Sequence, residues 1–167
     1  MHIRSATLED CKALSRIAGN TFALACPADT PAEELELYIS ENPTPSSFQA
    51  ALNAPEQSVL VLEKAGAVVG FSLVNHKPEK LGIPQADGIP ELTRCYVDTA
   101  HHGTGAAQAL MAATLAGVTT PIRLAVNDQN ARAIGFYQRN GFQAVGETSF
   151  QCGEDVHRDL VMVRRVG

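Results

Sequence analysis

The pattern of apolar and polar positions along the chain predicts that strands and helices alternate. Residues 2–5 are typical of a short first strand, and Thr7 is placed to cap a helix that ends near Gly19. The apolar side chains of this helix recur at helical spacing and comprise Leu8, Cys11, Leu14 and Ile17 or Ala18. The chain therefore opens with a strand followed by a helix.

The segment between Cys26 and Pro55 interrupts this pattern. Five of the nine prolines of the chain fall in it: Pro27, Pro31, Pro43, Pro45 and Pro55. Proline inside a helix removes a hydrogen bond and clashes with the preceding turn. The segment therefore predicts short helical pieces, such as residues 32–39, packed over one end of a sheet.

Two apolar, β-branched runs follow, at residues 58–63 and 67–74. They are too short for helices, and Lys64, Ala65 and Gly66 join them, so they predict an antiparallel hairpin. The next segment, residues 76–90, is rich in proline and glycine and predicts a loop.

A strand, a helix and a second strand then predict a βαβ unit. The first strand covers residues 91–97, the helix residues 103–116 and the second strand residues 122–126. One face of the helix carries Ala107, Leu110, Met111 and Thr114. A connection of this length predicts parallel strands with a right-handed crossover.

The last part of the chain predicts one more helix and an antiparallel pair of strands. The helix covers residues 130–139 and ends at Asn140 and Gly141, which form a good C-terminal cap. The two strands, near residues 142–150 and 156–165, are expected to turn at Gly153. Together the elements predict a single α/β domain over residues 1–167.

Composition narrows the class of protein. A chain of 167 residues with 45% apolar side chains is long enough for one full core and too short for two ordinary domains. Four cysteines without a CxxC pair, and no apolar signal-peptide stretch, predict free thiols in the cytoplasm. No apolar run approaches the roughly 20 residues that cross a bilayer, so a soluble protein is expected. The net charge of −5 argues against nucleic acid and leaves cationic small molecules open as partners.

A glycine turn follows the strand at residues 91–97. Gly103 and Gly105 let the backbone approach a ligand closely, and the amides of residues 103–107 would converge on an anion at the helix start. A pyrophosphate fits that geometry, and a tight turn without a ligand is the plain alternative. A dinucleotide fingerprint fits less well because Gln108 stands at the third glycine position, and a P-loop is excluded because no Gly-Lys-Ser/Thr follows.

Two segments resemble motifs of the GNAT superfamily of acyl-CoA N-acyltransferases. The strand from Glu91 and its turn resemble motif A, in which Arg or Gln is followed after two residues by Gly, one residue, and Gly or Ala. Gly105 and Ala107 match, and His102 stands at the Arg or Gln position, where its charge would be weaker and pH-dependent. The matches to motif B are Asn130, Ala133, Phe136, Tyr137, Gly141 and Phe142.

The resemblance implies an α/β fold of the GNAT type: a mixed sheet of about six to seven strands, about four helices, and two strands that splay at the acyl-CoA site. It implies acetyl-CoA as co-substrate, with the backbone of Cys95 and Val97 paired to the pantetheine arm. The residues that it puts at the pyrophosphate are His102, Gly103, Thr104, Gly105, Ala106 and Ala107. The acetyl group, or another short acyl group, would move to an amine by direct attack in a ternary complex.

For three side chains the resemblance implies a catalytic or binding role, and each also has an ordinary structural interpretation. Glu91 would take the proton of the acceptor amine, directly or through water, or would be a carboxylate that is solvated or paired with a nearby arginine. Asn130 would bind the pantetheine arm and can also cap its helix. Tyr137, two turns later on the same helix face, would protonate the departing thiolate, or would be a core tyrosine with its hydroxyl at the rim. Strand alternation predicts one shared face for Glu91, Thr93, Cys95 and Val97.

Other chemistries fit the residues less well. Cys95 and Cys152 have no accompanying His and Asp or Asn, so no cysteine nucleophile is predicted. His101 and His102 are adjacent, project apart and lack further ligands at a known spacing, so no metal is predicted.

The acceptor is the open part of this interpretation. Glu33, Glu34 and Glu36 could attract a polyamine or another cationic amine, or form only a solvated face. The expected partner is an amine-bearing small molecule or peptide, without nucleic acid or membrane, and a homodimer is left open. The rival functions are a noncatalytic acyl-CoA-binding regulatory module and an acyl-CoA hydrolase that uses water as the acceptor.

Overall fold

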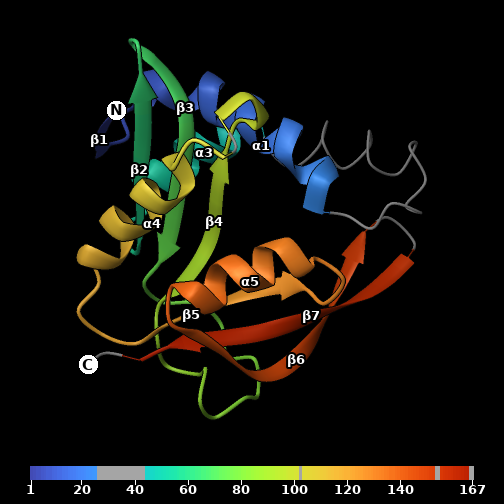
Figure 1. Cartoon of the computed structure of the whole chain (residues 1–167). Helices are drawn as coiled ribbons and strands as arrows, with labels where there is room; N and C mark the ends of the chain where they lie inside the picture. The colour runs from blue at the N-terminus through green and yellow to red at the C-terminus, as the bar shows by residue number, and fades with distance from the viewer. Residues whose placement is uncertain (26–43, 102, 153–154, 166–167) are drawn as a thin grey trace.

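A seven-stranded sheet forms the centre of the molecule, in the order β1-β2-β3-β4-β5-β7-β6 (Figure 1). The structure, a computed structural model, describes residues 1–25, 44–101, 103–152 and 155–165. The strands are β1 (His2–Ser5), β2 (Gln57–Lys64), β3 (Ala67–Asn75), β4 (Glu91–Val97), β5 (Ile122–Asn127), β6 (Phe142–Cys152) and β7 (Asp155–Arg164). The α-helices of the described residues are α1 (Cys11–Ala25), α3 (Pro45–Asn53), α4 (Ala106–Ala116) and α5 (Ala131–Arg139), with 3₁₀ turns η1 (Leu8–Asp10) and η2 (Thr99–His101).

The pairing of the strands confirms the predicted topology. β2 and β3 form the expected antiparallel hairpin, and β6 and β7 form the expected antiparallel pair, whose turn at Gly153 lies outside the described residues. β4 and β5, joined through α4, are parallel. Residues 76–90 contain neither helix nor strand, as predicted. The mixed α/β architecture therefore agrees with the fold class that the sequence indicates.

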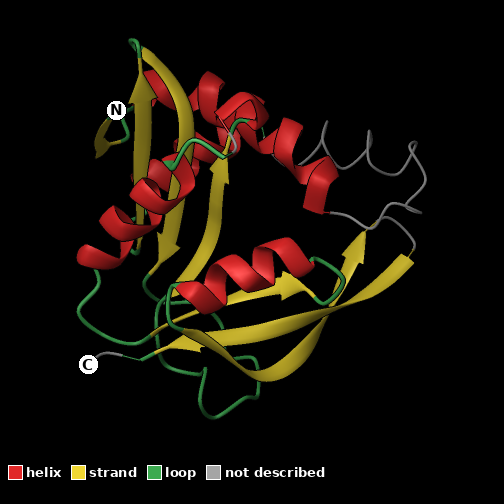
Figure 2. Ribbon diagram, viewed as in Figure 1, coloured by secondary structure: helices red, strands yellow, loops and turns green. Residues whose placement is uncertain are grey.

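Helices cover both faces of the sheet (Figure 2). α1 and α3 lie on one face, where Leu14 and Ile17 are fully buried in a cluster that contains Phe71 of β3. α4 and α5 lie on the other face, over buried side chains that include Leu92 of β4 and Leu124 of β5. For a residue of β3 or β4, the face to which its side chain points therefore decides which pair of helices it meets.

α1 is longer than the sequence predicts. It follows the turn η1, which leaves Leu8 56% exposed, and as Cys11–Ala25 it continues beyond Gly19. A glycine inside a helix costs about 1 kcal/mol, and burial of the face around Ile17 offsets that cost. Within the described residues the helix extends to Ala25.

The proline-rich excursion is described only in part. The helical piece predicted at residues 32–39 lies outside the described residues, and so do Glu33, Glu34 and Glu36. The described piece is α3, which begins at Pro45 after the cap Thr44, whose hydroxyl oxygen accepts from the amide of Ser47 at 3.2 Å. Proline is favoured in the first helical turn because its missing amide would have no helical partner there. Pro45 therefore starts a helix and does not break one.

Candidate functional site

The parallel strands β4 and β5 pair at Glu91 and Arg123 and then diverge. In Figure 1, β4 rises toward the start of α4, while β5 runs behind α5. On its other edge β4 keeps a ladder with β3 as far as Val97. Beyond Glu91, therefore, β4 has no ladder with β5 among the described residues. This divergence is the splay that the resemblance implies.

The turn between β4 and α4 holds two glycines in the left-handed backbone region. Gly103 has a φ of 78°, and Gly105, the N-cap of α4, has a φ of 84°. The sequence predicts that this helix starts at Gly103. A right-handed helix needs a φ near −60°, so α4 begins only at Ala106. Ala106 is 1% exposed and packs in a cluster with Val97, which holds the helix start beside the end of β4.

The start of α4 is suited to an anion. Gly105 has no side chain to cap the helix, so the first amides of α4 need another acceptor. The helix dipole adds partial positive charge at the same end. Residues 103–105 are exposed, Ala107 is partly buried, and the hydroxyl of Thr104 donates to the carbonyl of His101, which closes the turn. His102, expected at the phosphate position, lies outside the described residues.

A bulge in β4 changes which side chains share a face. Arg94 pairs with Leu73 of β3, but Leu92 pairs with Val74, so Thr93 is an extra residue between two consecutive positions of the ladder. A bulge places two residues opposite one and shifts the alternation of side chains. Thr93 is exposed, whereas Leu92 before it is 4% exposed.

The predicted shared face of β4 is therefore wrong. Cys95 and Val97 pack in the clusters beneath α4 and α5, together with Leu92. Glu91 precedes Leu92 and points to the opposite face, which also carries Tyr96 against the α1 cluster. The sheet thus separates the Glu91 carboxylate from the side chain of Cys95.

Arg123 holds Glu91 where the two strands meet. Arg123 is 1% exposed, and its Nε–H donates to Oε1 of Glu91 at 3.1 Å. Its two terminal nitrogens donate to the carbonyl of Ala86 at 3.0 Å and to that of Glu79 at 2.6 Å. The carboxylate of Asp87 lies 3.7 Å from the same guanidinium. A carboxylate paired with a nearby arginine was one of the alternatives for Glu91, and the structure identifies that arginine as Arg123.

Tyr137 of α5 is partly buried against apolar side chains on the other face of the sheet. Its ring packs on Phe142 with centroids 5.9 Å apart, and it lies in the cluster that Cys95 also touches. Burial raises the pKa of the Tyr137 phenol well above its usual range, and the nearby Cys95 and Tyr96 raise it further. Burial also raises the pKa of the Cys95 thiol, to about 12. Tyr137 is therefore a protonated hydrogen-bond donor beside β4 at neutral pH.

Asn130 caps α5, as its plain alternative predicted. Its side-chain Oδ1 accepts from the backbone amide of Ala133 at 3.2 Å. Its backbone N–H donates to the carbonyl of Asn127 at 3.0 Å. Asn130 and Tyr137 are two turns apart on α5 and so lie along one side of the helix. The cap uses the oxygen of the Asn130 side chain and leaves its amide nitrogen Nδ2 for a ligand.

Sequence reasoning missed Asn127, the last residue of β5. The residue is 8% exposed, and its side-chain nitrogen Nδ2 has no hydrogen-bond acceptor within the described chain. An asparagine after a strand is also typical of an ordinary turn, so the sequence alone carries no signal that distinguishes it.

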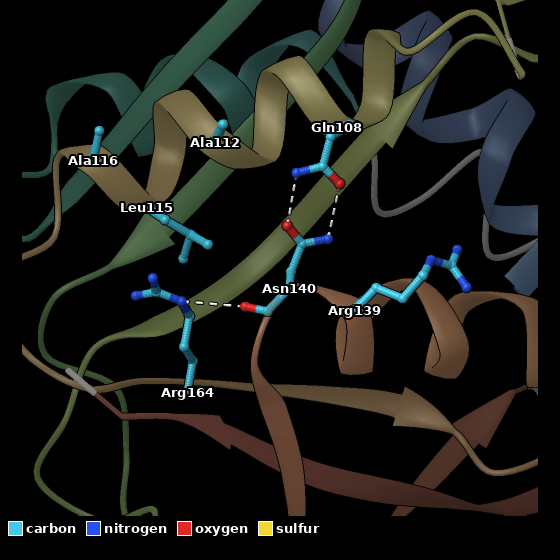
Figure 3. Close-up of a pocket in the computed structure, with 7 residues that line it drawn as sticks. All are labelled: Gln108, Ala112, Leu115, Ala116, Arg139, Asn140 and Arg164. Atoms are coloured by element: carbon cyan, nitrogen blue, oxygen red, sulfur yellow. Dashed lines mark hydrogen bonds between the residues drawn. The ribbon is translucent and has the colours of Figure 1, made fainter. Parts of the chain in front are cut away.

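A cavity of about 470 Å³ lies between α4, the end of α5 and β7 (Figure 3). It is lined by Gln108, Ala112, Leu115, Ala116, Arg139, Asn140 and Arg164. The amides of Gln108 and Asn140 donate to each other at 2.8 and 3.1 Å, and Nε of Arg164 donates to the carbonyl of Asn140 at 3.2 Å. These contacts join the end of α5 to α4 and to β7.

Two features are absent from the described residues. No group of three or more His, Cys, Asp and Glu side chains in them is arranged to hold a metal ion. None of their helices is both long enough and apolar enough to cross a membrane.

Comparison with known proteins gives consistent matches. The model of the acetyltransferase (GNAT) family matches residues 23–142. An uncharacterized N-acetyltransferase of Mycobacterium tuberculosis is 32% identical over 163 residues, which cover 95% of this chain and 99% of that protein. The PaiA N-acetyltransferase of Thermoplasma acidophilum in complex with coenzyme A has a TM-score of 0.74 at 18% identity and covers 98% of both chains. The Salmonella typhimurium yncA structure with its cofactor acetyl-CoA has a TM-score of 0.66 at 21% identity, over 100% of this chain and 94% of that one.

Proposed function

Because this chain belongs to the GNAT family of acetyltransferases, we propose that it transfers an acetyl group from acetyl-CoA to the amine of a small molecule or peptide. The observation that supports this most is the divergence of β4 from β5 after Glu91 and Arg123, with the uncapped start of α4 at the end of β4. An acyl-CoA needs both features, since its diphosphate requires hydrogen-bond donors and its pantetheine arm requires backbone outside a ladder.

In this proposal the co-substrate lies on the side of the sheet that α4 and α5 cover. The diphosphate meets the amides of residues 103–107, and the pantetheine arm follows the backbone of Cys95 and Val97. The amide nitrogen of Asn130 is available to the same arm, because the helix cap uses only the oxygen. Tyr137 lies next to Cys95, so its hydroxyl is near the thioester in this arrangement.

The chemical step that we propose is direct attack in a ternary complex. The amine nitrogen attacks the thioester carbon, a C–N bond forms, and the C–S bond breaks. The departing thiolate gains a proton from the hydroxyl of Tyr137. The amine loses its proton to Glu91, directly or through water. No covalent enzyme intermediate is needed, since proximity and proton transfer account for the step.

Glu91→Gln tests the proposed base. The variant keeps the size of the side chain and an oxygen for the Nε–H of Arg123, but it removes the group that takes a proton. We expect kcat to fall about 100-fold and its dependence on pH to change, measured by steady-state turnover across the pH range. Thermal unfolding of the variant controls for loss of the ion pair. An unchanged pH profile would leave Glu91 as only the partner of Arg123.

The function itself is tested by release of coenzyme A thiol from acetyl-CoA in the presence of polyamines, amino acids, peptides and aminoglycosides. Amine-dependent release is the expected result, and calorimetry in parallel should show that acetyl-CoA binds. Release that does not depend on amine would indicate a hydrolase. Tight binding without turnover on any amine would favour the noncatalytic acyl-CoA-binding module.

A further inference from the structure

Arg94 of β4 is a partly buried cation whose hydrogen-bond donors the described chain does not use. None of its N–H groups donates to an oxygen of the described residues. The other described arginines that are not exposed all donate to oxygens: Arg4, Arg123 and Arg164. A guanidinium carries five N–H donors, and withdrawing its charge from water without a partner costs free energy. The unused donors of Arg94 are therefore suited to an anion from outside the chain.

An aromatic ring determines the direction of this side chain. The Cζ atom of Arg94 lies over the ring of Phe48 in α3, 5.9 Å from the ring centroid. Such a cation–π contact uses the charge of the guanidinium but leaves its N–H donors for hydrogen bonds. The Phe48 ring is 3% exposed and packs edge-on against Phe71 of β3. Because β3 lies on the side of β4 away from β5, the guanidinium leans away from the divergence of β4 and β5.

Arg94 and Glu91 share a face of β4. Arg94 pairs with Leu73, which is buried in the α1 cluster, so both side chains face α1 and α3. Glu91 points to the same face, and the exposed bulge residue Thr93 lies between them in the chain. In the proposed step Glu91 takes the proton of the amine. Two opposite charges on one face would orient an acceptor that carries an amine at one end and an anion at the other.

We propose that Arg94 binds an anionic group of the acceptor, a carboxylate or a phosphate, which several bonds separate from the reacting amine. This inference rests on the proposed acetyltransferase function and narrows its acceptor. The amine lies between Glu91 and the thioester, at the divergence of β4 from β5, whereas the guanidinium leans toward β3. A carboxylate on the carbon that carries the amine is therefore too close to the amine to reach Arg94. The planar guanidinium can donate two parallel N–H bonds to either anion.

The test compares four acceptors: 4-aminobutyrate, its neutral analogue 4-aminobutanamide, O-phosphoethanolamine and alanine. The better of 4-aminobutyrate and O-phosphoethanolamine identifies the anion, and its kcat/KM should exceed that of 4-aminobutanamide and of alanine at least about 10-fold. Arg94→Met keeps an apolar side chain over Phe48 and removes the cation. It should lower kcat/KM for the preferred anionic acceptor about 10- to 100-fold, while the rate with 4-aminobutanamide and the KM for acetyl-CoA stay within about twofold.

Lys12→Met is the matched control, because Lys12 is an exposed cation of α1, on the same side of the sheet as Arg94. It removes one positive charge from that side and should leave all four rates unchanged. If Arg94→Met does not fold, Arg94→Lys keeps the charge, lacks the planar pair of donors and serves the same comparison.

Four outcomes would contradict this inference. Use of 4-aminobutanamide at the same rate as both anionic acceptors, or an equal loss on all of them in Arg94→Met, would overturn the role of Arg94 and leave the acetyltransferase intact. Preference for alanine would overturn the separation between amine and anion. Turnover of polyamines with none of these four acceptors would overturn the anionic acceptor alone. Absence of amine-dependent thiol release with every amine tested would contradict the proposed function together with this inference.

Discussion

Replacing Arg123 with leucine should lower the free energy of unfolding by about 3–5 kcal/mol. The guanidinium is almost fully buried, and it donates to Glu91 and to the carbonyls of Glu79 and Ala86. Leucine fills part of the volume but donates nothing, so two carbonyls and a carboxylate lose their partner. Chemical denaturation of the variant and the wild-type protein measures the difference.

Arg158→Met is the control for this prediction. Arg158 also pairs with a glutamate, Glu147 at 3.5 Å, but the two side chains are 66% and 51% exposed. Exposed ion pairs of this kind contribute about 0–1 kcal/mol. A loss at Arg123 no larger than the loss at Arg158 would show that the contacts of Arg123 do not hold the loop at residues 76–90 to the sheet.

Changing Tyr137 to phenylalanine should lower kcat by about 100-fold or more. The variant removes the phenol hydroxyl but keeps the ring that packs on Phe142. The departing thiolate would then have to leave without a proton from the protein. Steady-state turnover at saturating acetyl-CoA measures the effect, with acetyl-CoA affinity and thermal stability expected to stay unchanged.

The direction of the pKa shift adds a second check on Tyr137. Burial raises the pKa of this phenol, so the proton stays on it through neutral pH and up to at least the ordinary tyrosine pKa of about 10. At every pH up to about 10, therefore, loss of this proton should not decrease the turnover of the wild-type protein. Full turnover in Tyr137→Phe with normal acetyl-CoA affinity would show that another group protonates the thiol.

Much of the chain could be predicted because the signals are local. The strand at residues 91–97 and the end of α5 before Gly141 agree with the structure. Gly141 has a φ of 91°, which an L side chain rarely adopts, and so its position in the sequence marks the end of a helix. Asn130 likewise caps α5 as its residue type predicts.

The failures share a different cause. Thr93 is a bulge because of how β3 aligns with β4, and nothing in β4 alone reveals it, so the predicted common face of Glu91 and Cys95 is wrong. Gly19 was expected to end α1, but packing of that helix on the sheet outweighs the local cost of a glycine. In both places contacts with distant residues override a local rule.

The sequence by itself determined the order of strands and helices, the glycine turn before α4 and the family to which the chain belongs. These depend on residues close together in the chain, where periodicity, caps and turns act through the backbone of a few neighbours. Only the tertiary structure decided that Arg123 pairs with Glu91 and that Asn127 keeps an unused donor. Such features depend on strand register and on burial, which arise only when segments dozens of residues apart pack together.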